Sequence, residues 1–111
     1  MKFTDSLKKN ADFRQVYKKG RSKSDRYLVL YVLPNNRDIN RLGISVSKKV
    51  GNSVVRHHLC RLVRESYRLH EDLYPLGYDL VTVLRTSARE ADFHQIEASL
   101  LYLLKCHGLL E

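Results

Sequence analysis

The chain has 111 residues, of which 43% are hydrophobic and 29% charged, and its formal net charge is +8 at pH 7. A chain of this length suits one domain that buries about 65% of its unfolded surface and folds without disulfides. The sequence contains no apolar run long enough to cross a membrane and no apolar signal-peptide segment. We therefore expect a single domain spanning residues 1–111, located in the cytoplasm.

The positive charge is concentrated in one part of the chain. Residues 1–70 contain 17 Lys or Arg and 5 Asp or Glu, a net charge of +12, whereas residues 71–111 have a net charge of −4. Such a local excess of cations is typical of proteins that bind a polyanion. The sequence therefore favours nucleic acid as the partner over a membrane, and it indicates no small-molecule substrate.

Two cysteines, Cys60 and Cys106, are too few and too far apart in the sequence for a zinc ligand set. Free thiols are the expectation in a reducing cytoplasm, and a single disulfide remains the alternative.

The first predicted element is a helix over residues 11–19, with Asn10 as its N-cap and Gly20 as the residue that ends it. Phe13 and Tyr17 lie four positions apart and share one face of this helix. Two interpretations of these rings remain open. They dock the helix on a sheet, or they lie at a groove edge, where each stacked base contributes about 1 to 3 kcal/mol.

Residues 21–26 are polar and basic, which suits a short strand or an irregular connector. Residues 26–33 form a strand rich in Val, Leu and Tyr that ends at the turn Pro34-Asn-Asn36. Both faces of this strand are apolar, so it is central in the sheet or its second face meets a ligand. On that second face Tyr31 can extend the aromatic surface of the first helix.

Residues 41–48 alternate between apolar and small or polar side chains, which predicts a strand with one buried face. The buried set is Leu42, Ile44 and Val46. Because Gly43 weakens a strand, we interpret it as leaving room for a backbone or a phosphate to approach the outer face.

The stretch from Ser45 to Arg68 combines a strand end, a turn and a basic helix. Asn52 or Ser53 can cap the helix, which then begins near Ser53 or Val54. Lys48 and Lys49 precede the helix N-terminus, whose partial positive charge adds to theirs and favours phosphate.

This basic helix has two distinct faces. At 100° per residue the apolar stripe contains Val55, Leu59, Leu62, Ser66 and Leu69, with Val63 at its margin. Arg61, Arg64, Arg68 and His57 fall on the opposite side. We therefore expect one face to pack on the sheet and the other to meet a polyanion, although a merely solvated basic helix is the alternative.

Two more elements complete the chain. Residues 78–84 form a strand that makes a βαβ unit with its predecessor, and residues 93–106 form a helix with Asp92 as N-cap. The predicted order is α-β-β-β-α-β-α, an α+β fold with three helices and a mixed sheet of about four strands. The general rule for such crossovers is right-handed.

The residues of a catalytic site are missing. His57 and His58 are adjacent, so on a helix they point about 100° apart and cannot chelate one metal. No Cys-His or Ser-His-Asp set can be assembled, and the basic half has too few carboxylates for a two-metal nuclease. We expect no catalytic residue, no metal ligand and no cofactor bound by this chain alone.

The central motif, Ser45-Val-Ser-Lys-Lys-Val-Gly-Asn-Ser-Val-Val-Arg56, is followed by Arg61, Arg64 and Glu65. It resembles the signature of the bacterial ribonuclease P protein component. Upstream, Phe13-Arg-Gln-Val-Tyr17-Lys-Lys-Gly20 and Leu28-Val-Leu-Tyr31 match the same family in pattern and order. The resemblance covers roughly residues 7–105 of the chain.

The resemblance implies a small basic subunit of an endoribonuclease that removes 5′ leaders from precursor tRNA. In that family a catalytic RNA subunit and Mg²⁺ carry out the hydrolysis, and the protein holds the leader and stabilises the RNA. The implied fold is a two-layer α/β sandwich like the second domain of a small-subunit ribosomal protein. It contains a left-handed βαβ crossover, which the general rule does not predict.

Roles carry over to the matching positions only. Phe13, Tyr17 and Tyr31 would line the cleft for the leader. The surface toward the catalytic RNA would contain a polar and basic set: Lys48, Lys49, Asn52, Arg56, His57, His58, Arg61, Arg64 and Arg68. The chain departs from the family pattern at His57, His58 and Cys60, where Asn and two basic residues are usual.

Two other classes of function fit parts of the sequence. A ribosomal or assembly protein without an enzymatic partner would share the basic helix and the sheet, but it needs no aromatic cleft. A metal-dependent nuclease acting alone would need more carboxylates than the basic half contains.

Overall fold

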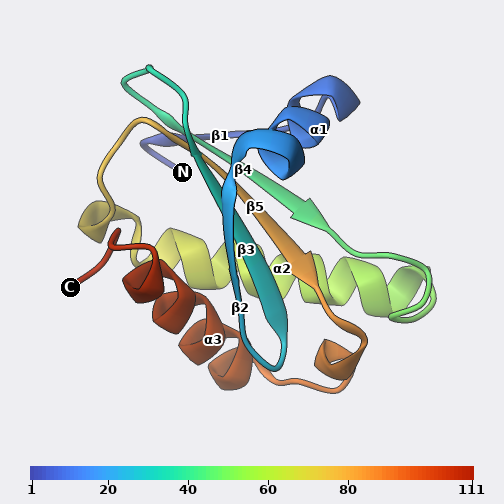
Figure 1. Cartoon of the computed structure of the whole chain (residues 1–111). Helices are drawn as coiled ribbons and strands as arrows, with labels where there is room; N and C mark the ends of the chain where they lie inside the picture. Colours follow the sequence, from blue (N-terminus) through green and yellow to red (C-terminus); the bar gives the residue numbers. More distant parts are fainter.

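A mixed sheet of five strands forms the centre of the computed structural model, which describes residues 1–111. The strands are β1 (Thr4–Ser6), β2 (Arg21–Ser24), β3 (Leu28–Pro34), β4 (Asn40–Ser45) and β5 (Tyr78–Leu84). Their order across the sheet is β1-β4-β5-β3-β2, so β5 is central and β1 and β2 are the edges (Figure 1). β4 is parallel to both β1 and β5, and the other neighbours are antiparallel.

Three α-helices surround this sheet, as predicted. They are α1 (Asn10–Lys19), α2 (Ser53–Leu69) and α3 (Phe93–Cys106), and two 3-10 turns lie at Glu71–Leu73 and Thr86–Ala88. α2 and α3 pack together on one face of the sheet, and α1 lies on the other face (Figure 1). The predicted α+β class is therefore confirmed, with the additional finding that α1 makes a separate, partial layer.

The connection from β4 through α2 to β5 is left-handed. Seen from the side of α1 with both strands pointing upward, β5 lies to the right of β4 and α2 passes behind the sheet (Figure 1). The family resemblance predicted this handedness, whereas the general rule for βαβ units predicts the opposite hand.

The strand count differs from the expected four because β1 was not predicted. Its residues, Thr4-Asp5-Ser6, are polar and lack any apolar alternation. They form a strand only because they pair in parallel with Asn40–Leu42 at the edge of β4. No local pattern in the sequence signals such a long-range pairing.

The helix ends show which capping predictions hold. α2 begins at Ser53 with Asn52 as N-cap, and the Asn52 side chain accepts a hydrogen bond from the Val55 backbone N–H at 3.0 Å. α3 begins after Asp92, which forms a capping box with Gln95. The prediction for α1 was wrong, because Asn10 is its first residue and Lys9 precedes it without a side-chain cap.

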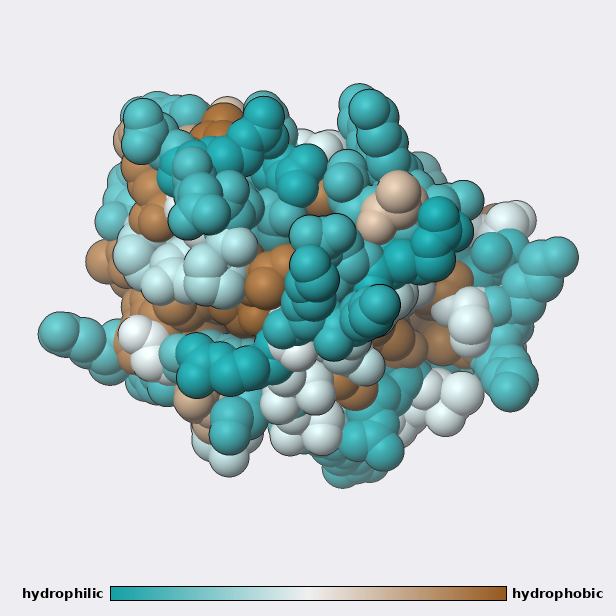
Figure 2. Space-filling model, turned by 45° about the horizontal axis from the view of Figure 1, so that its top comes forward, coloured by the Kyte–Doolittle hydropathy of each residue, from teal (hydrophilic) through white to brown (hydrophobic).

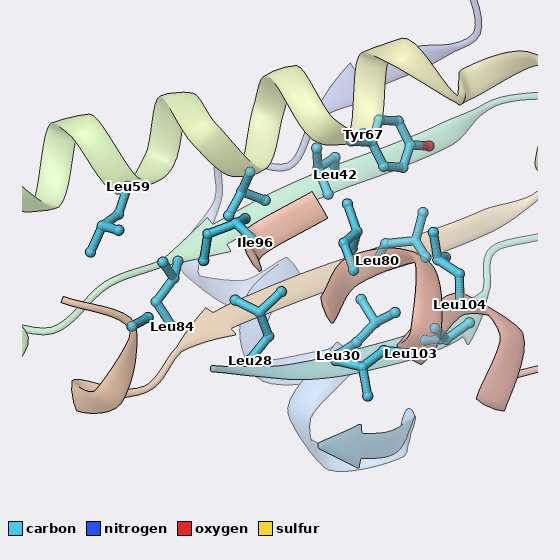
Figure 3. Packing of buried hydrophobic residues seen from close by; sticks show 14 of the residues in the cluster. Leu28, Leu30, Leu42, Leu59, Tyr67, Leu80, Leu84, Ile96, Leu103 and Leu104 are labelled. Atoms are coloured by element: carbon cyan, nitrogen blue, oxygen red, sulfur yellow. The ribbon is translucent and has the colours of Figure 1, made fainter. Parts of the chain in front are cut away.

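The main core lies between the sheet and the pair α2 and α3. Alternate residues of β3, Leu28 and Leu30, point toward these helices and are fully buried (Figure 3). They meet Leu59 of α2 and Ile96 of α3 in the same cluster. Fully burying one such side chain stabilises a fold by about 1.5 to 3 kcal/mol.

A second, smaller cluster holds α1 on the other face of the sheet. Its buried members are Leu7, Val16 and Val81, with Phe13 and Tyr31 packed at its border. Gly43 of β4 lies under this helix: a Cβ there would be 2.7 Å from Cζ of Phe13. The room that Gly43 leaves is thus filled by an aromatic ring, and our interpretation of it as a phosphate approach was wrong.

Candidate RNA-binding surfaces

The buried face of α2 fixes which of its side chains can reach a partner. Leu59, Val63, Ser66 and Tyr67 are buried against the core. This stripe is rotated from the predicted one, because Tyr67 is buried and Leu69 is half exposed. The rotation follows from Tyr67, whose hydroxyl lies 3.0 Å from Thr4 Oγ1 of the unpredicted strand β1.

The opposite face of α2 and the loop before it form what we call the α2 basic surface. Its members are the predicted RNA-binding residues: Lys48, Lys49, Asn52, Arg56, His57, His58, Arg61, Arg64 and Arg68. All of them except Arg56 are exposed. The structure therefore brings this set together on one helix and its N-terminal loop.

The arginines of the α2 basic surface differ in whether they are already paired with an acidic residue of the chain. Arg68 is paired with Glu65 one turn earlier, and its hydrogen bonds lower the pKa of the Glu65 carboxyl. Arg61 and Arg64 have no acidic partner within the chain. A phosphate would therefore meet unpaired guanidinium groups at these two positions.

Arg56 is half-buried, which sequence periodicity did not predict. Its Nε is buried without a hydrogen-bond partner.

One turn further along α2, burial raises the pKa of the Cys60 thiol, while the charges of Arg64 and Arg56 oppose this shift. Cys60 is half-buried and Cys106 is exposed, and both are free thiols.

Not every cation of the basic half is available to a partner. Arg41 donates two hydrogen bonds to the buried Asp79 carboxylate, from Nε at 2.8 Å and Nη2 at 2.6 Å. Burial works to raise the pKa of Asp79, but the hydrogen bonds from Arg41 and Asn35 prevail, so this pKa lies below its usual value. Arg41 is therefore a structural residue of the outer sheet face.

Aromatic rings gather on the outer face of the sheet, beside α1. The ring centroids of Tyr17 and Tyr31 are 5.0 Å apart in an edge-to-face arrangement, and those of Phe13 and Tyr17 are 6.3 Å apart. Tyr17 is 38% exposed, so this cluster reaches the surface. The structure thus brings the three predicted cleft residues together.

A shallow hollow of about 470 Å³ adjoins these rings, and we call it the aromatic groove. Its lining includes Phe13 and Tyr17 from α1 and, from β4 and the residue after it, Ile44, Ser45 and Val46. The sequence reasoning missed these three as groove residues: alternation assigned Ile44 and Val46 to the buried face, but both are only half-buried where β4 ends at Ser45. Figure 2 shows small hydrophobic areas exposed between hydrophilic side chains on the face that it presents.

The aromatic groove and the α2 basic surface lie on different faces of the sheet but are joined by one loop. This loop runs from Val46, which lines the groove, to Asn52, which caps α2. Lys48 and Lys49 lie between them and are exposed. A polyanion that contacts both surfaces can therefore also contact Lys48 and Lys49 between them.

The chain offers no grouping of three or more His, Cys, Asp or Glu that could hold a metal ion. None of its helices is both long and apolar enough to span a bilayer.

Comparison with known proteins decides the family. A family profile described as Ribonuclease P matches residues 1–108. The chain belongs to this family. Among its relatives, the ribonuclease P protein component of Lachnoclostridium phytofermentans is 49% identical over 107 residues, which make up 96% of this chain and 92% of that protein. The one from Alkaliphilus metalliredigens is 47% identical over 105 residues, 95% of each protein.

Solved structures of ribonuclease P proteins share the whole fold. The Staphylococcus aureus protein superposes with a TM-score of 0.85 at 41% identity, over 96% of this chain and 97% of that one. The Thermotoga maritima protein gives a TM-score of 0.84 at 34% identity, over 92% and 96% of the two chains.

Membership makes the chain a protein subunit of the ribonuclease P holoenzyme, an endoribonuclease that associates with an RNA subunit and processes the 5′ leader of precursor tRNA. It replaces the alternative of a ribosomal or assembly protein without an enzymatic partner.

Proposed function

We propose that this single domain holds two RNA elements of ribonuclease P at once, with two surfaces of different chemistry. The α2 basic surface binds the RNA subunit, and the aromatic groove binds the unpaired 5′ leader of precursor tRNA. The observation that carries this proposal is the cluster of Phe13, Tyr17 and Tyr31 beside an open groove. Unpaired bases stack on exposed rings, whereas paired bases cannot reach them.

The α2 basic surface suits a structured RNA because its charges are fixed on a rigid helix. Arg61 and Arg64 are exposed without acidic partners. Phosphate contacts of this kind position an RNA without reading its sequence. His57 and His58 are exposed on the same surface and can donate hydrogen bonds to phosphate oxygens.

Hydrolysis itself is assigned to the RNA subunit. The residues of this chain that face RNA are cations, amides and rings, and they include no set of carboxylates for a metal-activated water. In this proposal the Mg²⁺ that the holoenzyme uses is held by RNA, and no cofactor or small-molecule substrate binds the protein. The site of action is the cytoplasm, where precursor tRNA is made.

Reconstitution tests this division of roles. Precursor tRNA is incubated at low Mg²⁺ with the protein alone, with the cognate RNA subunit alone, and with both. We expect no cleavage by the protein alone and faster 5′-leader removal with both than with RNA alone, because bound protein cations offset phosphate repulsion. Cleavage by the protein alone would show that the assignment of hydrolysis to RNA is wrong.

A further inference from the structure

A second hollow lies on the other face of the sheet from the aromatic groove, between the edge strand β1 and helix α2. Its volume is about 370 Å³, and we call it the β1–α2 pocket. Its lining combines side chains from three parts of the chain: Ser6, Lys8, Leu42, Ile44, Cys60 and Arg64. The function proposed above makes no use of this pocket.

The pocket exists because the two neighbouring strands differ in length. β1 pairs with β4 only from Asn40 to Leu42, whereas β4 continues to Ser45. Beyond Ser6 the edge of β4 therefore has no strand beside it, although α2 still passes over it. Ile44 is left half-buried at this edge.

The lining of the pocket is mixed in chemistry. Leu42 and Ile44 are apolar, and Ser6 and Cys60 contribute a hydroxyl and a thiol. Lys8 and Arg64 line it without an acidic partner in the chain, and Asp5 is its one carboxylate. A flat ring with polar edges and an attached anion fits this combination.

We propose that the β1–α2 pocket receives one unpaired base of the RNA subunit, turned out of its helix, with Arg64 and Lys8 on the phosphates beside it. This inference rests on the function proposed above, because Arg64 belongs both to the α2 basic surface and to the pocket lining. An RNA lying along α2 therefore passes the pocket entrance. Proteins recognise unstacked bases in RNA by enclosing the ring and contacting its polar edge.

Size supports one base as the occupant. Sites for small organic ligands measure about 300 to 1,000 Å³, and the pocket volume of about 370 Å³ lies at the small end of that range. Lys8 and Arg64 outnumber Asp5 around the pocket. This excess of positive charge favours a nucleotide over an uncharged metabolite or a peptide.

The two cysteines allow a direct test of occupancy. Cys60 lines the pocket, and Cys106 lies at the end of α3, outside it. Variants with a single thiol, C106S and C60S, are alkylated with N-ethylmaleimide in the presence and absence of the cognate RNA subunit. At RNA concentrations ten times the Kd we expect Cys60 to react about tenfold more slowly, and Cys106 at an unchanged rate.

Protection of Cys60 could also result from RNA that covers the helix without entering the pocket. A variant in which a larger side chain fills the pocket distinguishes RNA that enters the pocket from RNA that only covers the helix. Ser6→Phe fills the pocket from β1 and leaves every side chain of α2 unchanged. If a base enters, this variant binds the RNA subunit about tenfold more weakly, whereas Cys106→Phe binds as the wild type does.

The outcomes distinguish the pocket from the wider proposal. Equal alkylation rates of Cys60 with and without RNA, or wild-type affinity of Ser6→Phe, would overturn the pocket assignment while leaving the α2 basic surface intact. If wild-type protein fails to bind the RNA subunit at all, the proposed function fails first. Should Ser6→Phe not fold, as judged by circular dichroism, Ser6→Leu, which fills the same pocket with a smaller side chain, takes its place in the binding measurement.

Discussion

Tyr17 is the residue whose surroundings are most informative about the leader. It is 38% exposed and its ring is in edge-to-face contact with Tyr31, 5.0 Å away. This combination leaves one part of the ring free for a base while the rest is held in place. A ring needed only for packing would be buried, as Tyr67 is at 1% exposure.

Tyr17→Ala should therefore weaken binding of precursor tRNA by the holoenzyme by about 1 to 3 kcal/mol, the value of one stacked base. Affinity for mature tRNA, which has no leader, should not change. Tyr102→Ala is the matched control, because Tyr102 is 56% exposed on α3, away from the groove. Equal losses for both RNAs would mean that Tyr17 acts through the fold and not through the leader.

His107 gives the fold a dependence on pH that is unrelated to RNA. Its Nε2 lies 2.8 Å from the Leu30 carbonyl oxygen, and its Nδ1 is buried without a partner. Burial lowers the pKa of His107, although the hydrogen bond to Leu30 acts in the other direction. Arg21 and Lys23 of β2 lower it further.

Because the folded pKa of His107 is lowered, the unfolded chain takes up this proton first as the pH falls. The resulting stability is complete above the unfolded pKa of about 6.5 and is lost below it, by at most about 1.4 kcal/mol per pH unit. His107→Gln should reduce the fall in unfolding free energy between pH 7 and 5.5, measured by urea denaturation. His94→Gln, at an exposed position of α3, should keep the wild-type profile, and identical profiles for all three proteins would contradict the assignment.

Individual residues also show where sequence reasoning stops. The grouping of Phe13 with Tyr17 follows from helical periodicity, but their contact with Tyr31 needs the packing of α1 on the sheet. Gly43 was misinterpreted because the ring that lies on it is 30 positions away in the sequence. Half-burial of Arg56 likewise depends on tertiary contacts that no local pattern encodes.

At the scale of the elements, α2 and α3 are both started by side-chain caps, but only one cap lies on the RNA side. Asn52 accepts from Val55 at the start of α2, and Asp92 accepts from Gln95 at the start of α3. Substituting these two residues therefore distinguishes the loss of a helix cap from the loss of an RNA contact.

Asn52→Ala and Asp92→Ala should each lower the unfolding free energy by about 1 kcal/mol, because each removes one helix cap. Only Asn52→Ala should also weaken binding of the RNA subunit, since Asn52 lies next to Lys48 and Lys49 on the α2 basic surface. The measurements are urea denaturation and filter binding. Equal RNA affinities for the two variants would restrict Asn52 to a structural role.

The capped helices α2 and α3 were predicted within one or two residues, but the strand expected over residues 41–48 ends at Ser45, three residues earlier. The bounds of α2 and α3 follow from caps and apolar spacing, whereas β3 is apolar on both faces, so the sequence alone did not indicate which face the main core covers. β1 could not be predicted because three polar residues carry no period. The left-handed crossover was expected only from the family resemblance, since no pairwise pattern encodes handedness.

At the scale of the whole molecule, positive charge is concentrated in one part of the chain and a smaller negative charge in the other. Residues 1–70, which contain α1, β1 to β4 and all of α2, have a net charge of +12, and the remainder has −4. α3 therefore contributes to packing while the basic half meets the polyanion.

RNA binding should accordingly depend strongly on salt. If about six phosphates are neutralised, the slope of log K against log salt concentration is about −4 with the coefficient for single-stranded nucleic acid. Arg64→Ala should reduce the magnitude of this slope by about 0.7, the contribution of one phosphate contact. Lys105→Ala, which removes the one cation of α3, should leave it unchanged. A slope near zero for the wild type would argue against a phosphate-based interface.

The position of β5 at the centre of the sheet has a consequence for synthesis on the ribosome. β3 and β4 each pair with β5 along one edge and have no ladder with each other, and their other partners are the edge strands β2 and β1. Because β5 ends at Leu84, most of the chain must be synthesised before β3 and β4 can pair with the strand that joins them. Until then the cationic part of the nascent chain is outside the exit tunnel while the sheet is still incomplete.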